Sequence, residues 1–148
     1  MKYQITKSRD KIMNGIIAGL AGGTVQTVYA IIMKALHFTN REFIDYGEIL
    51  VMGKDFPGTA TIVGVVAHLV NAAAWGALFS IILTLGRPRY FVIKGIGLGI
   101  FVWLFSLAIA TMFKLPMFHL VPPGVAYILL AGAILWGAVM SFTYKKLQ

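Results

Sequence analysis

The sequence predicts an all-α integral membrane protein, a four-helix bundle whose chain crosses a bilayer four times. Apolar residues make up 59% of its 148 residues and charged residues 12%, whereas soluble domains contain about half and about a quarter. The mean hydropathy is +0.83. The apolar excess is concentrated in four nearly uncharged runs, each about as long as a membrane span. The chain has no cysteine, which excludes disulfides, thiolate metal sites and cysteine nucleophiles.

We expect a single transmembrane domain over residues 1–148. Its four spans are predicted at about 12–36, 58–85, 91–113 and 121–144. Gly86 and Pro88 predict a short basic turn after the second span, and Pro122 and Pro123 suit the opening turn of the fourth span.

The segment 37–57 between the first two spans carries four of the five acidic residues, interleaved with apolar ones. It favours either a short interfacial helix or a solvated outer loop with an apolar underside.

The basic residues predict the orientation of the spans. Nine of the thirteen lysines and arginines lie in the N-terminal segment, in the stretch 87–94 or at the C-terminus. Since basic residues mark the cytoplasmic side, we expect both termini in the cytoplasm and the segment 37–57 outside. The net charge of +8 is thereby explained without a nucleic-acid partner. The expected location is the cytoplasmic (inner) membrane of a bacterium or an archaeon, as a multi-pass protein.

The spans also suggest an internal repeat of two helical hairpins with the same orientation, a parallel repeat of the kind found in some transporters. The second and fourth spans align at a constant offset, and the first and third spans share two glycines four residues apart. Small residues at this spacing let helix backbones approach closely in lipid. The predicted helix-packing residues are Gly15, Gly19, Gly23, Ala72, Gly76, Ser80, Gly95, Gly99, Ala133, Gly137 and Ser141.

One polar cluster in the spans is the candidate cofactor-binding site. His68 and Asn71 lie one helical turn apart in the second span, and Gln26 and Tyr29 lie at comparable depth in the first. These four residues could bind haem or hold the head of a quinone. The alternative is that they join the helices by hydrogen bonds, for example from His68 or Asn71 to Gln26 or Tyr29, without any ligand.

A haem held by two histidines would need a second ligand from His37 or His119, which are both predicted near the outer surface. Asp45 and Glu48 could bind a divalent cation there together with these histidines. The alternative is that the two carboxylates are solvated and paired with Arg41 or Lys54.

Several function classes are disfavoured. The spans contain no Asp or Glu, although coupled secondary transport usually relies on an intramembrane carboxylate. The sequence has no serine–histidine–acid arrangement, no phosphate-binding glycine loop and no zinc-protease motif. We therefore expect neither catalytic residues nor a metal site, and no enzymatic activity.

The glycine-rich first span is followed by Asp45-x-x-Glu48, then by His68, Gly95…Gly99…Trp103 and Leu135-Trp136-Gly137-Ala138-Val139. With these features the chain resembles small four-span bacterial membrane proteins of the YqhR/YagU kind over most of residues 14–144. The resemblance implies the four-span topology and no particular activity. Those proteins often have a second histidine on the last span, where this chain has Ala133 or a neighbour, so the resemblance supplies no second histidine ligand.

Together these features predict a non-catalytic accessory or scaffolding subunit, surrounded by membrane lipids and associated with other membrane subunits or with copies of itself. One alternative is a redox-linked subunit that binds haem or quinone near His68. Another is a small channel or carrier for a neutral solute.

Overall fold

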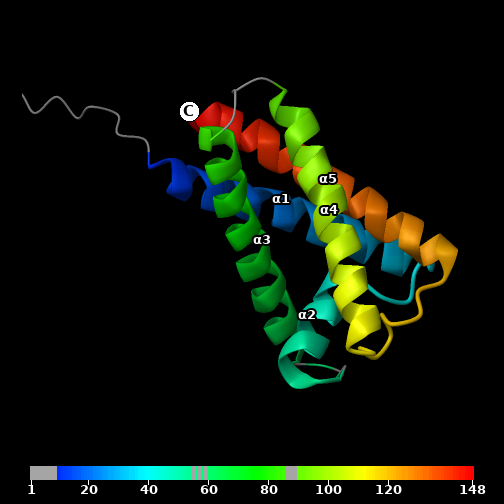
Figure 1. Ribbon diagram of the computed structural model, residues 1–148. Helices are drawn as coiled ribbons and strands as arrows, with labels where there is room; N and C mark the ends of the chain where they lie inside the picture. The colour runs from blue at the N-terminus through cyan, green and yellow to red at the C-terminus, as the bar shows by residue number, and fades with distance from the viewer. Residues whose placement is uncertain (1–9, 55, 57, 59, 86–89) are drawn as a thin grey trace, which may run out of the picture.

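The computed structural model describes residues 10–54, 56, 58, 60–85 and 90–148. This part of the chain is helical and contains no strand (Figure 1). Its helices are α1 (Lys11–Ala35), α2 (Phe43–Met52), α3 (Ala60–Leu85), α4 (Phe91–Met112) and α5 (Pro123–Leu147). All of them except α2 are long and apolar enough to cross a membrane. The predicted all-α architecture with four long apolar helices is thus confirmed.

The long helices form two packed pairs that are joined along one side. α3 packs on α1, α4 packs on α5, and α1 and α5 pack on each other, whereas α3 and α4 make few direct contacts. Figure 1 shows α3 and α4 in front of α1 and α5, with α2 between the lower ends of the front helices. The bundle is therefore closed on the α1–α5 side and has a gap between α3 and α4.

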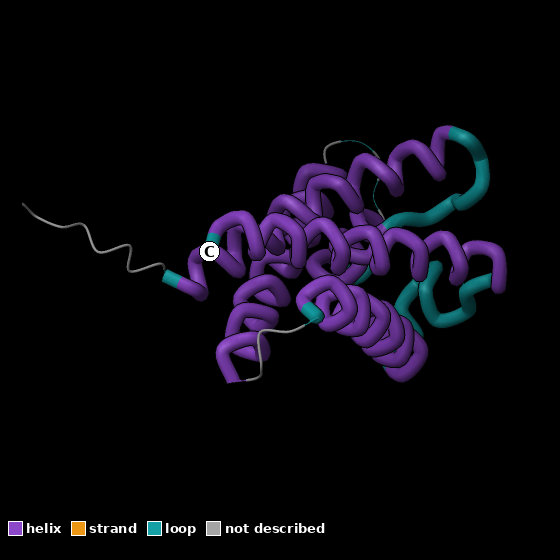
Figure 2. Tube along the Cα trace, turned by 90° about the horizontal axis from the view of Figure 1, so that it is seen from above, coloured by secondary structure: helices purple, strands orange, loops and turns teal. Residues whose placement is uncertain are grey.

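Two contacts fix the ends of the bundle. The Asn14 side chain donates a hydrogen bond of 3.2 Å to the carbonyl of Leu147, so α1 begins where α5 ends; we call this the terminal end. At the opposite end, the Arg41 guanidinium donates to the carbonyls of Met117 and Leu120, which joins the connection after α1 to the connection after α4. The longer described connections gather there, opposite the C-terminus (Figure 2).

A chain that crosses a membrane an even number of times has both termini on one side. The start of α1 and the end of α5 lie together at the terminal end, as such a chain requires. The basic segment 1–9 and the basic turn 86–89, on which the predicted orientation depends, lie outside the described residues.

Small residues bring α1 and α3 into backbone contact. A Cβ atom added to Gly19 would overlap the carbonyl oxygen of Ala72, and one added to Gly76 would overlap the carbonyl oxygen of Gly15. Ser80 lies against Gly15, and its hydroxyl donates to the carbonyl of Ala77 within its own helix. Since every polar group in lipid needs an internal partner, this bond lets a serine lie at a dry crossing.

The α4–α5 crossing is built from the equivalent residues. A Cβ atom on Gly99 would overlap the carbonyl oxygen of Ala133, and one on Gly137 would overlap that of Gly95. Ser141 again lies against the first glycine of the crossing and donates to a carbonyl of its own helix, at 2.6 Å. The small residues predicted to pack thus meet in two separate crossings with the same pairing.

α2 has its polar side turned inward. Glu42, Asp45 and Glu48 are 2–6% exposed, whereas Leu50 and Val51 are more than half exposed. The segment 43–52 is thus a helix rather than a loop. It buries Ile44 and Ile49 together with its carboxylates, while Leu50 and Val51 face outward. An outward apolar face suits a helix surrounded by lipid, as the predicted interfacial helix would be.

An ion pair holds the acidic side of α2 in place. The Lys34 ammonium lies 3.0 Å from Glu42 Oε1 and 3.0 Å from Asp45 Oδ1. Asp45 also accepts a 2.8 Å hydrogen bond from the Glu42 backbone N–H at the start of the helix. At the other end, Gly53 adopts a φ of +80° and donates its N–H to the carbonyl of Ile49, a left-handed C-terminal residue that favours glycine.

A candidate ligand cavity between α3 and α4

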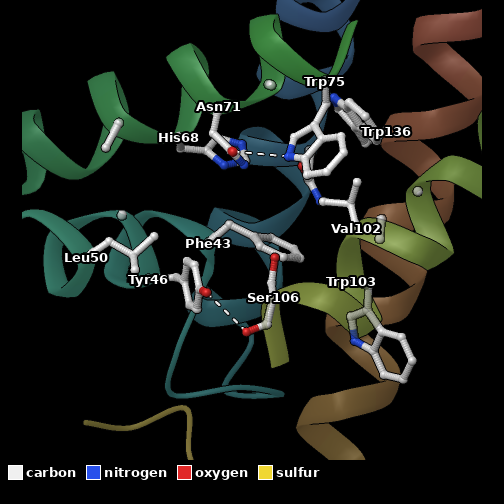
Figure 3. A pocket seen from close by; sticks show the side chains of 16 residues that line it. Phe43, Tyr46, Leu50, His68, Asn71, Trp75, Val102, Trp103, Ser106 and Trp136 are labelled. Atoms are coloured by element: carbon white, nitrogen blue, oxygen red, sulfur yellow. Dashed lines mark hydrogen bonds between the residues drawn. The ribbon is translucent and has the colours of Figure 1, made fainter. Parts of the chain in front are cut away.

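The gap between α3 and α4 contains a cavity with a volume of about 90 Å³. α3 and α4 make few direct contacts, and α2 lies between them at one end only (Figure 1). Figure 3 shows the side chains that line the cavity. A water molecule needs roughly 10–15 Å³ of such volume, so the cavity has room for several waters or for one small ring. Its lining comes from all five helices: Gln26 of α1; Phe43, Tyr46, Gly47 and Leu50 of α2; Ala67, His68, Asn71, Ala72 and Trp75 of α3; Gly99, Val102, Trp103 and Ser106 of α4; and Ala133 and Trp136 of α5.

His68 is the most deeply placed titratable group of this lining. His68 is 7% exposed, and its ring stacks on Phe43 of α2 with 5.9 Å between the ring centroids. On the α1 side, the Gly23 backbone is within hydrogen-bonding reach of the ring. The missing side chain of Gly23 makes room for Ala72, since a Cβ atom there would lie 2.8 Å from the Ala72 Cβ. The Nε2 atom is buried and has no hydrogen-bond partner among the described residues. Buried polar atoms are nearly always paired, so the unpaired nitrogen of a residue that lines the cavity marks a functional candidate.

Asn71 lies one turn further along α3, on its exposed surface. Its Oδ1 accepts a 3.1 Å hydrogen bond from the Trp75 indole N–H. This bond orients the amide, and the two donors of the NH₂ group have no partner among the described residues. Asn71 therefore presents hydrogen-bond donors at the edge of the cavity.

The opposite wall contains a second unpaired donor. The Trp103 Nε1–H on α4 is buried and makes no hydrogen bond within the described part of the chain. The Tyr46 hydroxyl on α2, in contrast, donates to the Ser106 carbonyl at 3.1 Å and so ties α2 to α4. Burial raises the pKa of Tyr46, which keeps this hydroxyl protonated and able to donate.

The four predicted cofactor-binding residues do not all meet. His68, Asn71 and Gln26 line the cavity, and Gln26 is 5% exposed. Tyr29 lies elsewhere: it packs on Gly132 of α5 and donates to the Ile128 carbonyl at 3.2 Å. The hydrogen bonds expected under the alternative, from His68 or Asn71 to Gln26 or Tyr29, are not formed in the described structure.

The donor set does not fit a haem held by two histidines. His37 and His119 are exposed residues of the connections, and neither lines the cavity. The His119 ring lies 2.9 Å from the Leu115 carbonyl of its own turn. His68 is therefore the one histidine at the cavity, and a volume of about 90 Å³ suits a single small ring better than a macrocycle.

The cation site considered as one possibility for the outer face is not assembled in the described part of the chain. No three His, Asp or Glu side chains in the described ranges are arranged to hold a metal ion. The carboxylate of Asp45 is paired, but with Lys34 instead of the expected Arg41 or Lys54. Arg41 binds backbone carbonyls, and Lys54 lies over the Phe56 ring.

The aromatic part of the site was not among the cofactor-binding residues predicted from the sequence. Phe43, Tyr46 and Trp103 line the cavity, but their sequence positions suit packing or membrane anchoring equally well. The sequence contains only three tryptophans, and all three line this one cavity. Their scarcity is the feature that could have marked them.

Comparisons with models of protein families, with curated proteins and with solved structures returned no match for this chain. The resemblance to four-span proteins of the YqhR/YagU kind therefore stays a prediction.

Proposed function

We propose that this protein is a non-catalytic membrane subunit that takes a lipid-soluble ligand into the cavity beside His68. The observation that carries the proposal is the buried, unpaired Nε2 of His68, a residue that lines a cavity with room for a ligand. An unpaired buried polar group costs about 1–3 kcal/mol. A ligand that pairs with this nitrogen would offset that cost.

The route to the cavity favours a ligand from the bilayer. The gap lies between α3 and α4, whose outer surfaces include the exposed residues Val70, Phe101 and Leu104. In a membrane this surface faces the acyl chains, so a solute dissolved in lipid would reach the gap directly. The lining contains no Asp, Glu, Lys or Arg, which favours a neutral ligand.

A second observation supports a role as a subunit of a larger assembly. α4 is the least buried of the four long helices, because it packs mainly on α5. Its free face is available for a neighbouring membrane subunit or a second copy of the chain. We place the protein in the cytoplasmic membrane of a bacterium or an archaeon with both termini inside, and we interpret the two matching glycine crossings as an internal repeat.

Native mass spectrometry of the intact particle, extracted gently from its membrane, tests the proposal. Wild-type protein should carry a lipid-soluble small molecule in stoichiometric amount, and Val102→Phe should lose it because Val102 lines the cavity. Leu104→Phe is the matched control: the same side chain is added two residues away on the same helix, at a position that is 59% exposed. Equal small-molecule content in wild type and Val102→Phe would overturn the ligand proposal.

The same spectra test the association. Release together with other membrane subunits, or as a homo-oligomer, would support the accessory role, whereas a monomer in every extraction would overturn it.

A further inference from the structure

We propose that the ligand is a flat ring with hydrogen-bond-accepting oxygens on two opposite edges, the chemistry of a quinone. This inference rests on the proposed function and adds the chemical class of the ligand. It follows from the hydrogen-bonding character of the cavity wall, from the positions of its donors and from its aromatic lining.

Two side chains that line the cavity have hydrogen-bond donors without acceptors. The indole N–H of Trp103 and the side-chain NH₂ of Asn71 can only donate, and both are unpaired within the described structure. The hydroxyl of Tyr46 is already bonded to a carbonyl. A neutral imidazole has one donor and one acceptor nitrogen, so His68 could either donate to the ligand or accept from it.

The donors lie on two different helices. His68 and Asn71 belong to α3, and Trp103 belongs to α4 across the gap (Figure 3). A ligand that satisfies both walls needs acceptors at two separated points. The carbonyl oxygens of a quinone lie on opposite edges of its ring, whereas a sterol or a fatty alcohol offers its oxygen at one end only. A phospholipid headgroup would bring a phosphate charge that no lining side chain neutralises.

The remaining lining suits a flat ring. Phe43, Trp75 and Trp136 present aromatic surface to the cavity, and aromatic rings stack favourably on one another. A volume of about 90 Å³ accepts the ring alone. An alkyl tail would then leave through the gap between α3 and α4 into the surrounding lipid.

Intrinsic fluorescence provides the test, because every tryptophan of the chain lines the cavity. The full-length protein in detergent is titrated with decyl-substituted benzoquinone, whose ring quenches tryptophan, and decylbenzene is used as a competitor without oxygens. We expect saturable quenching that decylbenzene displaces poorly. His68→Leu, Asn71→Leu and Trp103→Phe should each weaken quinone binding about tenfold, the loss of roughly one hydrogen bond to the ligand.

His119→Leu is the matched control, since it removes a histidine that does not line the cavity and should leave the affinity unchanged. Trp103→Phe keeps an aromatic ring in place, so it still tests the donor if a leucine variant fails to fold.

The outcomes separate the two proposals. If decylbenzene competes as well as the quinone and the three variants bind like wild type, the acceptor-bearing ring is overturned while a lipid-soluble ligand in the cavity still stands. If no saturable quenching occurs and Val102→Phe carries the same small molecules as wild type, both proposals fail.

Discussion

The two helix crossings share their packing residues and differ at the positions that line the cavity. Gly15 and Gly19 meet Ala72 and Gly76 in one crossing, as Gly95 and Gly99 meet Ala133 and Gly137 in the other. At the offset that relates Ala72 to Ala133, His68 corresponds to Leu129 and Asn71 to Gly132. At the offset that relates Gly15 to Gly95, Gly23 corresponds to Trp103.

The difference shows that packing does not require a polar wall. Leu129 is 3% exposed and lies in an apolar cluster with Ile49 and Phe118, so the same type of crossing forms with leucine in the place of histidine. A crossing of this type therefore does not depend on a histidine or an asparagine at the positions of His68 and Asn71. Their presence beside a cavity is better explained by a ligand than by helix association.

The largest expected effect comes from breaking one crossing. Gly95→Leu should unfold the α4–α5 pair or cost about 3 kcal/mol or more, because the new side chain would meet the backbone of α5 and the Ser141 hydroxyl. Gly97→Leu is the control, since a Cβ atom there meets nothing within 4 Å, and we expect a change within about 0.5 kcal/mol. Unfolding of the purified protein in mixed detergents measures both, and similar losses in the two variants would contradict the crossing.

The next largest loss of stability is expected when the α4–α5 crossing receives a histidine at the position that corresponds to His68. Leu129→His should destabilise the protein by about 2–4 kcal/mol, because it removes buried apolar volume and buries an imidazole in an apolar cluster. Leu120→His, at a 75% exposed position, should be nearly neutral. If Leu129→His were as stable as wild type, both crossings would tolerate histidine equally. The histidine of α3 would then not distinguish the two regions.

Replacing His68 by leucine, as at the corresponding position 129, should change the free energy of unfolding less and in the opposite direction. His68→Leu removes an unpaired buried nitrogen and should stabilise the ligand-free protein by about 1 kcal/mol. The same variant should lose affinity for the quinone probe. A clear loss of stability in ligand-free detergent would instead assign His68 a role in packing.

The smallest effect concerns α2, which only the first hairpin contains. The pKa of Tyr46 is raised by burial above its ordinary value of 10.0. The folded state therefore favours the neutral phenol, and the resulting stability is intact below pH 10 and is lost as the pH rises through the folded-state pKa. Tyr46→Phe should remove this part of the alkaline loss, measured as the difference in unfolding midpoint between neutral and alkaline buffer; identical pH profiles would contradict it.

The sequence predicted the long helices and the close-packing residues because both depend on local composition. Hydropathy identifies an apolar run without knowledge of its neighbours, and glycines four residues apart define one helix face. The inward carboxylates of α2 were not predictable in this way, because helical spacing groups Asp45 with Glu42 or Glu48 but does not tell which side faces the bundle. That choice depends on Lys34 of another helix.

The candidate site was predicted only in part. His68 stands out in the sequence as a histidine within an apolar run, and it does line the cavity. Tyr29 lies at a similar depth but faces α5, since depth along a helix does not determine direction around it. Trp103 could not be chosen from sequence alone, because its role depends on a gap between helices that no single helix encodes.

The hydrogen bond between Asn14 and Leu147 has a consequence for biosynthesis. α1 leaves the ribosome before α5, yet α1 packs along α5 and the Gly19 carbonyl accepts a hydrogen bond from the Trp136 indole. Until α5 is inserted, the face of α1 around Gly22, which meets Trp136 in the folded protein, is open to the bilayer. A chain truncated before α5 would keep that surface exposed, and membrane quality-control proteases could distinguish it from the finished protein.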